Sequence, residues 1–238
     1  MSHTVFITGA SRGLGLELAR QFLDAGSCVF AAARVPESNT LQSLKSVHGD
    51  QLQLLALDVT DGEQISKTVA SLAGQPLHLL INNAGLFLDN PFVGDPGTDC
   101  LSTVESNRWL TVFRVNTIAP FMMTRALRAN LKAADPGTVV MISAMMGSLT
   151  NNQSGGAYSY RSSKAALNAV TVSLATDLAA DGTRVVALHP GWLQTEMGGH
   201  DAPVDTPTSA KGLRAVMLNI DAKQNGGFFD HTGRPIPW

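Results

Sequence analysis

A tyrosine and a lysine four positions apart are the residues of this chain whose chemistry is easiest to state. They are Tyr160 and Lys164. On a helix, residues four apart share a face, so the Lys164 ammonium can lie near the Tyr160 hydroxyl. A phenol is a poor acid or base at pH 7, but a neighbouring cation favours its ionised form and lowers its pKa. We therefore expect Tyr160 to donate or accept a proton; the alternative is an ordinary surface pair. Tyr158 has Ser162, not a cation, four positions on and is not chosen.

A glycine-rich turn between a strand and a helix is the second candidate site. The apolar stretch 5–8 runs directly into a turn with Gly9, Gly13 and Gly15, and a helix-period segment follows. Gly9 can adopt positive φ, Gly13 lets a pyrophosphate approach the backbone, and Gly15 lets the helix pack on the strand. The free N–H groups and the dipole at the helix N-terminus attract an anion. The stretch predicts a dinucleotide phosphate site; the alternative is a glycine turn without a ligand.

The residues after the second predicted strand bear on the choice between NAD and NADP. A dinucleotide fold that prefers NAD has an acidic residue about 20 positions past the glycines, bound to the ribose hydroxyls. This chain has Ala33-Arg34 there. A carboxylate would repel a 2′-phosphate, whereas Arg34, helped by Arg12 in the glycine turn, can pair with it. NADP(H) is therefore the predicted cofactor; the alternative for either arginine is a solvated surface charge.

Small polar residues follow the third and fourth predicted strands. Asp58 can accept a hydrogen bond from an adenine amino group or can cap the next helix, and the two roles can be divided between Asp58 and Asp61. Asn83, Ala84 and Gly85 suit a backbone held against a ligand ribose, or they form a simple turn.

Asn116 is a polar amide in an otherwise apolar helical segment that includes Phe113, Ile118 and Phe121. A buried amide needs hydrogen-bond partners. Either its side chain relieves a helix kink through backbone bonds, or it organises a buried water beside the chemistry. The two interpretations are compatible.

These candidates need a scaffold that brings distant segments together, and the hydrophobic pattern predicts one. Short apolar runs alternate with helix-period segments, which is typical of an α/β fold. The expected strands are 5–8, 28–33, 51–58, 77–82, 138–143, 183–188 and 227–230, and the clearest helices are 14–25, 62–73, 115–134 and 158–180. No repeat or linker divides the chain, so we expect one domain, 1–238: a doubly wound parallel sheet of about seven strands with helices on both faces. Ligands then bind beyond the carboxyl ends of the strands.

Composition excludes several other classes. The 238 residues are 44% hydrophobic and 15% charged, with a net charge of −2 and no basic block, so neither nucleic acid nor a membrane is an expected partner. A strand that begins by about Thr4 leaves no room for a signal peptide, which favours the cytoplasm. Cys28 and Cys100 show neither metal-ligand nor disulfide spacing, and both are expected to be reduced. The histidines lack metal-site spacing as well, and His189 is interpreted as structural.

Taken together, the motifs resemble the short-chain dehydrogenase/reductase family along the whole chain. The resemblance rests on the turn at 8–15, the run Asn82-Asn83-Ala84-Gly85, Asn116, the Tyr160/Lys164 pair and Pro190-Gly191. The stretches 188–199 and 225–229 further resemble the branch of sniffer-type carbonyl reductases and bacterial C-factor proteins.

The resemblance implies a Rossmann fold and hydride transfer between NADP(H) and a carbonyl or alcohol group of a small, fairly apolar molecule. Tyr160 would protonate the carbonyl, Lys164 would bind the ribose and tune Tyr160, and Asn116 would hold a proton-relay water. Pro190, Gly191 and Thr195 would line the nicotinamide end. With the residues above, the expected cofactor contacts are Gly9, Ser11, Arg12, Gly13, Leu14, Gly15, Arg34, Asp58, Val59, Asn83, Ala84, Gly85, Tyr160, Lys164, Pro190, Gly191 and Thr195.

Two larger features follow from the same resemblance. Residues 192–211, rich in Gly, Pro and Thr, would form a substrate lid, and the alternative is a plain surface loop. The helices around 98–134 and 158–180 would pair two copies of the chain, which gives a homodimer or homotetramer.

One position departs from the family pattern. The family usually ends its fifth strand with two serines and uses the second to hold the substrate carbonyl, whereas this chain has Ser143-Ala144. Ser143, our candidate for the role, can take it only if the strand twists or bulges, because successive side chains point to opposite faces. Otherwise Ser148 folds back, or the enzyme works with fewer donors. The remaining hypotheses are a cofactor-binding signalling or interaction protein with reduced catalysis, and a member with non-redox chemistry such as isomerisation.

Overall fold

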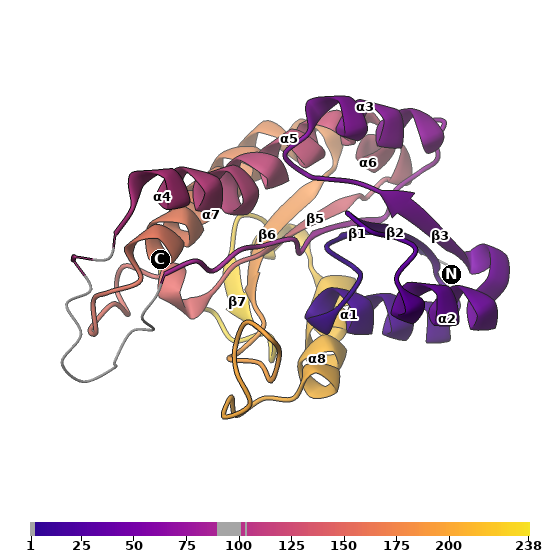
Figure 1. The fold of residues 1–238 in the computed structure, drawn as a ribbon. Helices are drawn as coiled ribbons and strands as arrows, with labels where there is room; N and C mark the ends of the chain where they lie inside the picture. The colour runs from indigo at the N-terminus through magenta and orange to yellow at the C-terminus, as the bar shows by residue number, and fades with distance from the viewer. Residues whose placement is uncertain (1–2, 90–100, 103) are drawn as a thin grey trace.

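A seven-stranded parallel sheet forms the centre of the molecule (Figure 1). The computed structural model describes residues 3–89, 101–102 and 104–238. The strand order is β3-β2-β1-β4-β5-β6-β7, and every neighbouring pair is parallel, which confirms the predicted doubly wound α/β fold. The strands are β1 (Thr4–Thr8), β2 (Cys28–Ala33), β3 (Leu52–Ala56), β4 (Leu79–Asn82), β5 (Thr138–Ile142), β6 (Arg184–His189) and β7 (Phe228–Asp230).

Helices cover both faces of this sheet (Figure 1). One face carries α1 (Gly13–Asp24), α2 (Asn39–His48) and α8 (Thr206–Asn219). The other carries α3 (Gly62–Ser71), α4 (Ser106–Phe113), α5 (Ala119–Ala126), α6 (Arg128–Ala134) and α7 (Tyr158–Asp177). Because both faces are covered, the central strands are apolar without alternation; every residue of β4 and of β5 is buried.

Two of the predicted ranges need correction. The range 115–134 is not one helix: a π-helical turn at Arg114–Ile118 leads into α5, and the chain breaks again before α6. The predicted lid, 192–211, is loop only up to Asp205. Asp205 caps α8 by accepting a hydrogen bond from the Thr208 backbone, and Pro207 occupies the first turn. The Gly, Pro and Thr residues of this range predict a loop. Pro and Thr are also found at helix N-termini, as here at the start of α8.

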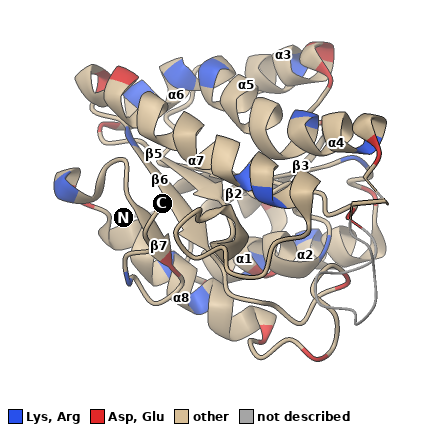
Figure 2. Cartoon of the chain, turned by 90° about the vertical axis from the view of Figure 1, so that its left-hand side faces the viewer, with Lys and Arg blue, Asp and Glu red and all other residues tan. Residues whose placement is uncertain are grey.

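Charged residues of both signs are interspersed over the helices (Figure 2). Among the described helices, none combines the length and the apolar character that crossing a bilayer demands. Cys28 is a free cysteine in β2, whereas Cys100 lies outside the described residues.

Candidate active site

The turn between β1 and α1 has the geometry expected of a phosphate site. Gly9 has a φ of 67°, a left-handed conformation that glycine adopts without strain. A Cβ on Gly15 would lie 2.5 Å from Asn83 Nδ2 and closer still to the Gly9 carbonyl oxygen, so only glycine lets α1 pack here. The side chain of the N-cap residue, Arg12, does not cap the first turn of α1. The N–H groups at this helix start therefore suit an anion such as a pyrophosphate.

The other predicted residues of this turn lie beside it. Gly13 has a φ of 53°, and a Cβ there would lie 3.5 Å from Thr195 Cγ2. The Ser11 carbonyl accepts a hydrogen bond of 3.0 Å from the Thr40 hydroxyl, and Leu14 is buried in the core. Thr195, another predicted contact residue, therefore lies beside the glycine turn although the two are more than 180 positions apart in the sequence.

The segment after β4 is hydrogen-bonded to the glycine turn. Asn83 Nδ2 donates to the carbonyl oxygens of Thr8 (2.9 Å) and Gly9 (3.1 Å). The backbone N–H groups of Asn83 and Ala84 both donate to Thr8 Oγ1 at 3.0 Å. These bonds hold the backbone of Ala84 next to the glycine turn.

Asn116 connects the same segment to the helices on the far side of the site. Its side chain is fully buried in the π-helical turn; Oδ1 accepts from Leu86 N–H at 2.7 Å, and Nδ2 donates to the Leu86 carbonyl at 2.8 Å. A third bond of 3.1 Å runs from Nδ2 to Ser163 Oγ. The amide therefore joins two other segments of the chain and does not bridge the kink of its own helix.

Tyr160 and Lys164 lie together on α7, as their spacing predicts. Lys164 Nζ lies 5.6 Å from the centre of the Tyr160 ring. Lys164 is only 4% exposed, and its ammonium donates a 2.7 Å hydrogen bond to the Ile142 carbonyl oxygen at the end of β5. A Cβ on Gly85 would lie 3.4 Å from Asn116 Oδ1 and 3.7 Å from Lys164 Nζ, so these groups surround one point.

The pKa of Tyr160 does not follow the prediction. Burial raises the pKa of Tyr160 to about 12, and burial likewise lowers the pKa of Lys164 to about 8. The cation was expected to lower the tyrosine pKa, but desolvation of the phenolate raises it, and the Lys164 ammonium bonds to the Ile142 carbonyl. At pH 7 Tyr160 is protonated and Lys164 is mainly charged.

Both serines considered as substitutes at the end of β5 are engaged in other hydrogen bonds. Ser143 Oγ is buried and donates to Asn168 Oδ1 at 2.7 Å. Ser148 Oγ bonds to the carbonyl oxygens of Pro237 (2.6 Å) and Trp238 (3.1 Å). Each hydroxyl has a single proton to donate, so neither is directed at a substrate in this arrangement.

The two arginines expected at the adenosine end differ in whether they form an ion pair. Arg34 is exposed and makes no ion pair with a described residue, whereas Arg12 is ion-paired with Glu196 of the predicted lid.

The aspartates after β3 have separate roles. Asp61 caps α3 by accepting hydrogen bonds from the backbone N–H groups of Glu63 and Gln64. Asp58 does not cap this helix; its Oδ1 accepts hydrogen bonds of 2.8 and 2.7 Å from the Thr60 N–H and hydroxyl. Val59, which follows Asp58, packs partly buried against the core.

The residues expected at the nicotinamide end follow β6. The Pro190 carbonyl accepts a 2.6 Å bond from Ser209 of α8, and Gly191 has a φ of 91°. Burial, and secondarily His231, lowers the pKa of His189 to about 4, so this imidazole is neutral at pH 7. His189 Nδ1 has no partner among the described residues.

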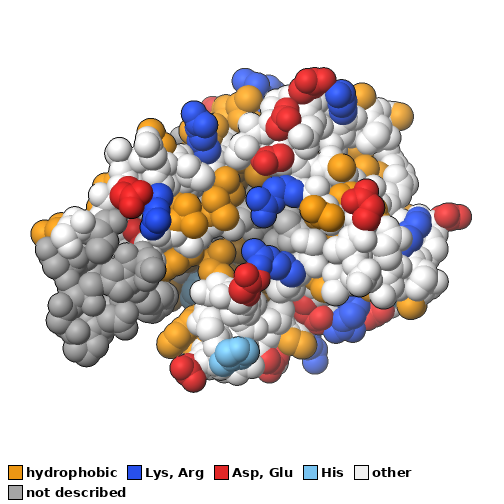
Figure 3. Space-filling view, viewed as in Figure 1, with side chains coloured by type: hydrophobic (Ala, Val, Ile, Leu, Met, Phe, Trp, Pro, Cys, Tyr) orange, Lys and Arg blue, Asp and Glu red, His pale blue; other side chains and the backbone are white. Residues whose placement is uncertain are grey.

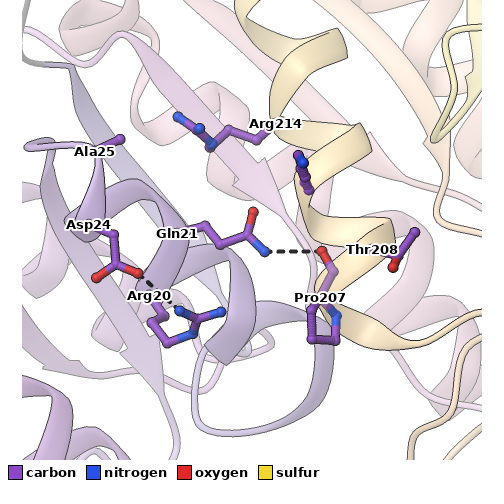
Figure 4. A pocket seen from close by; sticks show the side chains of 8 residues that line it. Arg20, Gln21, Asp24, Ala25, Pro207, Thr208 and Arg214 are labelled. Atoms are coloured by element: carbon purple, nitrogen blue, oxygen red, sulfur yellow. Dashed lines mark hydrogen bonds and ion pairs between the residues drawn. The ribbon is translucent and has the colours of Figure 1, made fainter.

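The surface has an apolar hollow next to α7, which carries Tyr160, and a separate groove that no predicted site residue lines. Hydrophobic side chains gather in a hollow between α4 and α7 and the loop before α8, on the face seen in Figure 3. A second groove of about 440 Å³ lies between α1 and α8 (Figure 4), where Gln21 donates to the Pro207 carbonyl at 3.0 Å. None of the predicted site residues lines this second groove, so it is not the candidate active site.

Two residues beside Tyr160 were not predicted. The Phe87 ring lies 4.9 Å from the Tyr160 ring, and the Asp89 carboxylate accepts from the Tyr160 backbone at 2.9 Å. Both contacts join positions about 70 residues apart, and no local spacing signals them.

Comparisons with known proteins agree with this geometry. Residues 3–203 match the short chain dehydrogenase family. The C-signal protein of Myxococcus xanthus is 39% identical over 164 residues, which cover 68% of this chain and 93% of that protein.

Solved structures of carbonyl reductases are similar along the entire chain. The NADPH-bound carbonyl reductase from chicken fatty liver is 33% identical with a TM-score of 0.90, and the alignment covers 100% of this chain and 99% of that one. The carbonyl reductase Sniffer of D. melanogaster is also 33% identical with a TM-score of 0.90, over 100% of both chains. The chain therefore belongs to the short chain dehydrogenase family of oxidoreductases, with the C-signal protein and the Sniffer carbonyl reductases among its relatives.

Proposed function

We propose that this protein transfers hydride between NADP(H) and the carbonyl or alcohol group of a small, fairly apolar molecule. The observation that carries the proposal is the buried Lys164 ammonium next to Tyr160 on α7. The glycine turn, where the Arg12 side chain does not cap α1, supports it. The apolar hollow next to α7 (Figure 3) supports an apolar substrate.

The predicted cofactor residues fit a dinucleotide. The first turn of α1 offers N–H groups to the pyrophosphate, and Arg34 is exposed and available for a 2′-phosphate. In this proposal Lys164 and Gly85 would contact a ribose, and Pro190 and Gly191 would border the nicotinamide. NADPH, when bound, supplies a hydride; the similar carbonyl reductase from chicken fatty liver is NADPH-bound.

Tyr160 supplies the proton in this scheme. Its raised pKa keeps the phenol protonated at pH 7, the form required to donate to a carbonyl oxygen as the hydride reaches the carbonyl carbon. The product is an alcohol, and the phenolate that remains lies beside the Lys164 ammonium until a proton returns from water. Asn116 keeps the 85–86 backbone fixed against this pair and would hold the relay water.

The substitution at Ala144 suggests that the reaction proceeds with fewer hydrogen-bond donors than is usual in the family. Because Ser143 and Ser148 bond to Asn168 and to the chain end, we infer that Tyr160 alone polarises the carbonyl. A signalling protein with reduced catalysis is the second candidate, favoured by Ala144 and by the relative whose name is C-signal. Turnover of NADPH with a panel of aldehydes, ketones and quinones separates the two, since only the first oxidises NADPH.

Replacing Tyr160 by Phe should abolish reduction and leave NADPH affinity nearly unchanged, because the hydroxyl acts mainly in the transition state. Steady-state oxidation and fluorescence titration of NADPH measure the two effects. The control is Tyr158→Phe, the only other tyrosine of the chain, which should retain turnover. A Tyr160→Phe protein with most of its activity would require another proton donor.

Arg34→Ala should weaken NADPH binding about ten- to a hundredfold, because one charged pairing is worth about 1.5–3 kcal/mol. NADH lacks the 2′-phosphate, so its dissociation constant should not change, and the wild-type protein should prefer NADPH. Lys223→Ala, which removes an exposed cation near the amino end of β7, is the charge-matched control. Equal dissociation constants of wild type for both cofactors would refute the prediction.

Ala144→Ser should raise turnover on simple carbonyls by up to about 10²–10³-fold. A hydrogen-bond donor aimed at a developing alkoxide typically increases kcat by about that factor. Initial rates at saturating NADPH measure the effect. Ser143→Ala and Ser148→Ala identify any substitute donor. An unchanged rate in Ala144→Ser, or a hundredfold loss in either serine variant, would contradict the view of a site with a missing donor.

For assembly we propose a homodimer or homotetramer formed through the outer helices. Leu110 of α4, Ile118 of the π-helical turn and Val172 of α7 are 61%, 51% and 43% exposed, and such apolar side chains suit an interface. Residues 98–100 and 103 of the predicted pairing region lie outside the described residues. Light scattering at micromolar concentration should give a mass of two or four chains, and Ile118→Glu should lower it; a monomeric wild type would exclude this assembly.

A further inference from the structure

The N-terminus of the helix that carries Tyr160 lacks a cap of its own. The N-cap residue of α7 is Ala157, with a φ of 44° and no side chain able to accept a hydrogen bond. The first N–H groups of a helix have no partner within that helix. In α7 these groups belong to the residues around Tyr160, so whatever accepts from them also determines where Tyr160 lies.

Asp89 accepts from these groups across 70 positions of sequence. Its Oδ1 accepts from Ser159 N–H at 3.1 Å, and its Oδ2 accepts from Tyr160 N–H at 2.9 Å and from Ser159 Oγ at 2.7 Å. A carboxylate that accepts from the backbone at a helix N-terminus is also favoured by the helix dipole. Both oxygens are engaged, which fixes the orientation of the carboxylate as well as its position.

We propose that Asp89 is a positioning residue that caps α7 from another segment and thereby places the Tyr160 hydroxyl; the proposal rests on the proton-donor role of Tyr160 proposed above. The cap is the last of a series of contacts along residues 83–89. Asn83 bonds to the glycine turn, Leu86 bonds to Asn116, and the Phe87 ring lies against Tyr160.

This segment therefore connects the cofactor turn, the buried amide and the proton donor. Only Asp89 in it bonds to the backbone of Tyr160 itself. Because a displacement of about 1 Å at a reacting group can reduce turnover about a hundredfold, the cap is expected to act on the rate and not on cofactor binding.

The test compares Asp89→Ala and Asp89→Asn with Asp61→Ala. Asp61 is the N-cap residue of α3 itself and accepts from two backbone N–H groups, but α3 carries no residue of the site. Asp89→Ala should lower kcat about ten- to a hundredfold while the dissociation constant of NADPH stays within about twofold. Asp89→Asn keeps one accepting oxygen and should recover part of kcat. Asp61→Ala should lower the melting temperature by about 2–4 °C without a change in kcat.

Hydrogen exchange supplies a readout that is independent of activity. The amides of Ser159 and Tyr160 should exchange faster in Asp89→Ala than in wild type, and those of Glu63 and Gln64 faster in Asp61→Ala. Unchanged exchange at 159–160, an unchanged kcat in Asp89→Ala, or an equal loss of kcat in Asp61→Ala would overturn the proposal. If Tyr160→Phe keeps its turnover, the proposed function fails, whereas the exchange result still decides whether Asp89 caps α7.

Discussion

The buried ammonium of Lys164 imposes the main constraint on this structure. A charged group removed from water requires compensating hydrogen bonds, and here the Ile142 carbonyl at the end of β5 supplies one. That bond fixes α7 against the sheet, and Gly147 allows the close approach, because a Cβ there would lie 2.9 Å from the Lys164 Cβ. Desolvation lowers the pKa of Lys164 and raises the pKa of Tyr160. The packing around α7 therefore determines the charge of both side chains.

The candidate site is assembled from loops and helices that are far apart in the sequence. Asn83 bonds to the turn after β1, Asn116 to the Leu86 backbone, and Asp89 to the first turn of α7. Each bond satisfies a backbone group that would otherwise lack a partner near the carboxyl ends of the strands. The same polar groups that complete the backbone hydrogen bonding therefore also connect the glycine turn to the start of α7.

Ala144 makes this site less polar than the family pattern. The two nearby serine hydroxyls bond to Asn168 and to the carbonyls of residues 237–238, where they stabilise the structure around the missing donor. Neither hydroxyl is therefore free to contact a ligand, and hydrophobic side chains gather in the hollow of Figure 3. The groove between α1 and α8 in Figure 4 belongs to a separate part of the surface.

The sequence alone determined the parallel sheet, the glycine turn and the pairing of Tyr160 with Lys164, because alternating apolar runs, glycine spacing and helical periodicity are local patterns. It left the helix cap open between Asp58 and Asp61, and the structure assigns the cap to Asp61. Only the tertiary structure decided the protonation of Tyr160, since burial depends on everything packed around α7. It likewise decided the partners of Asn116, Ser143 and Asp89, because hydrogen bonds between segments 25 to 70 positions apart leave no periodic trace in the sequence.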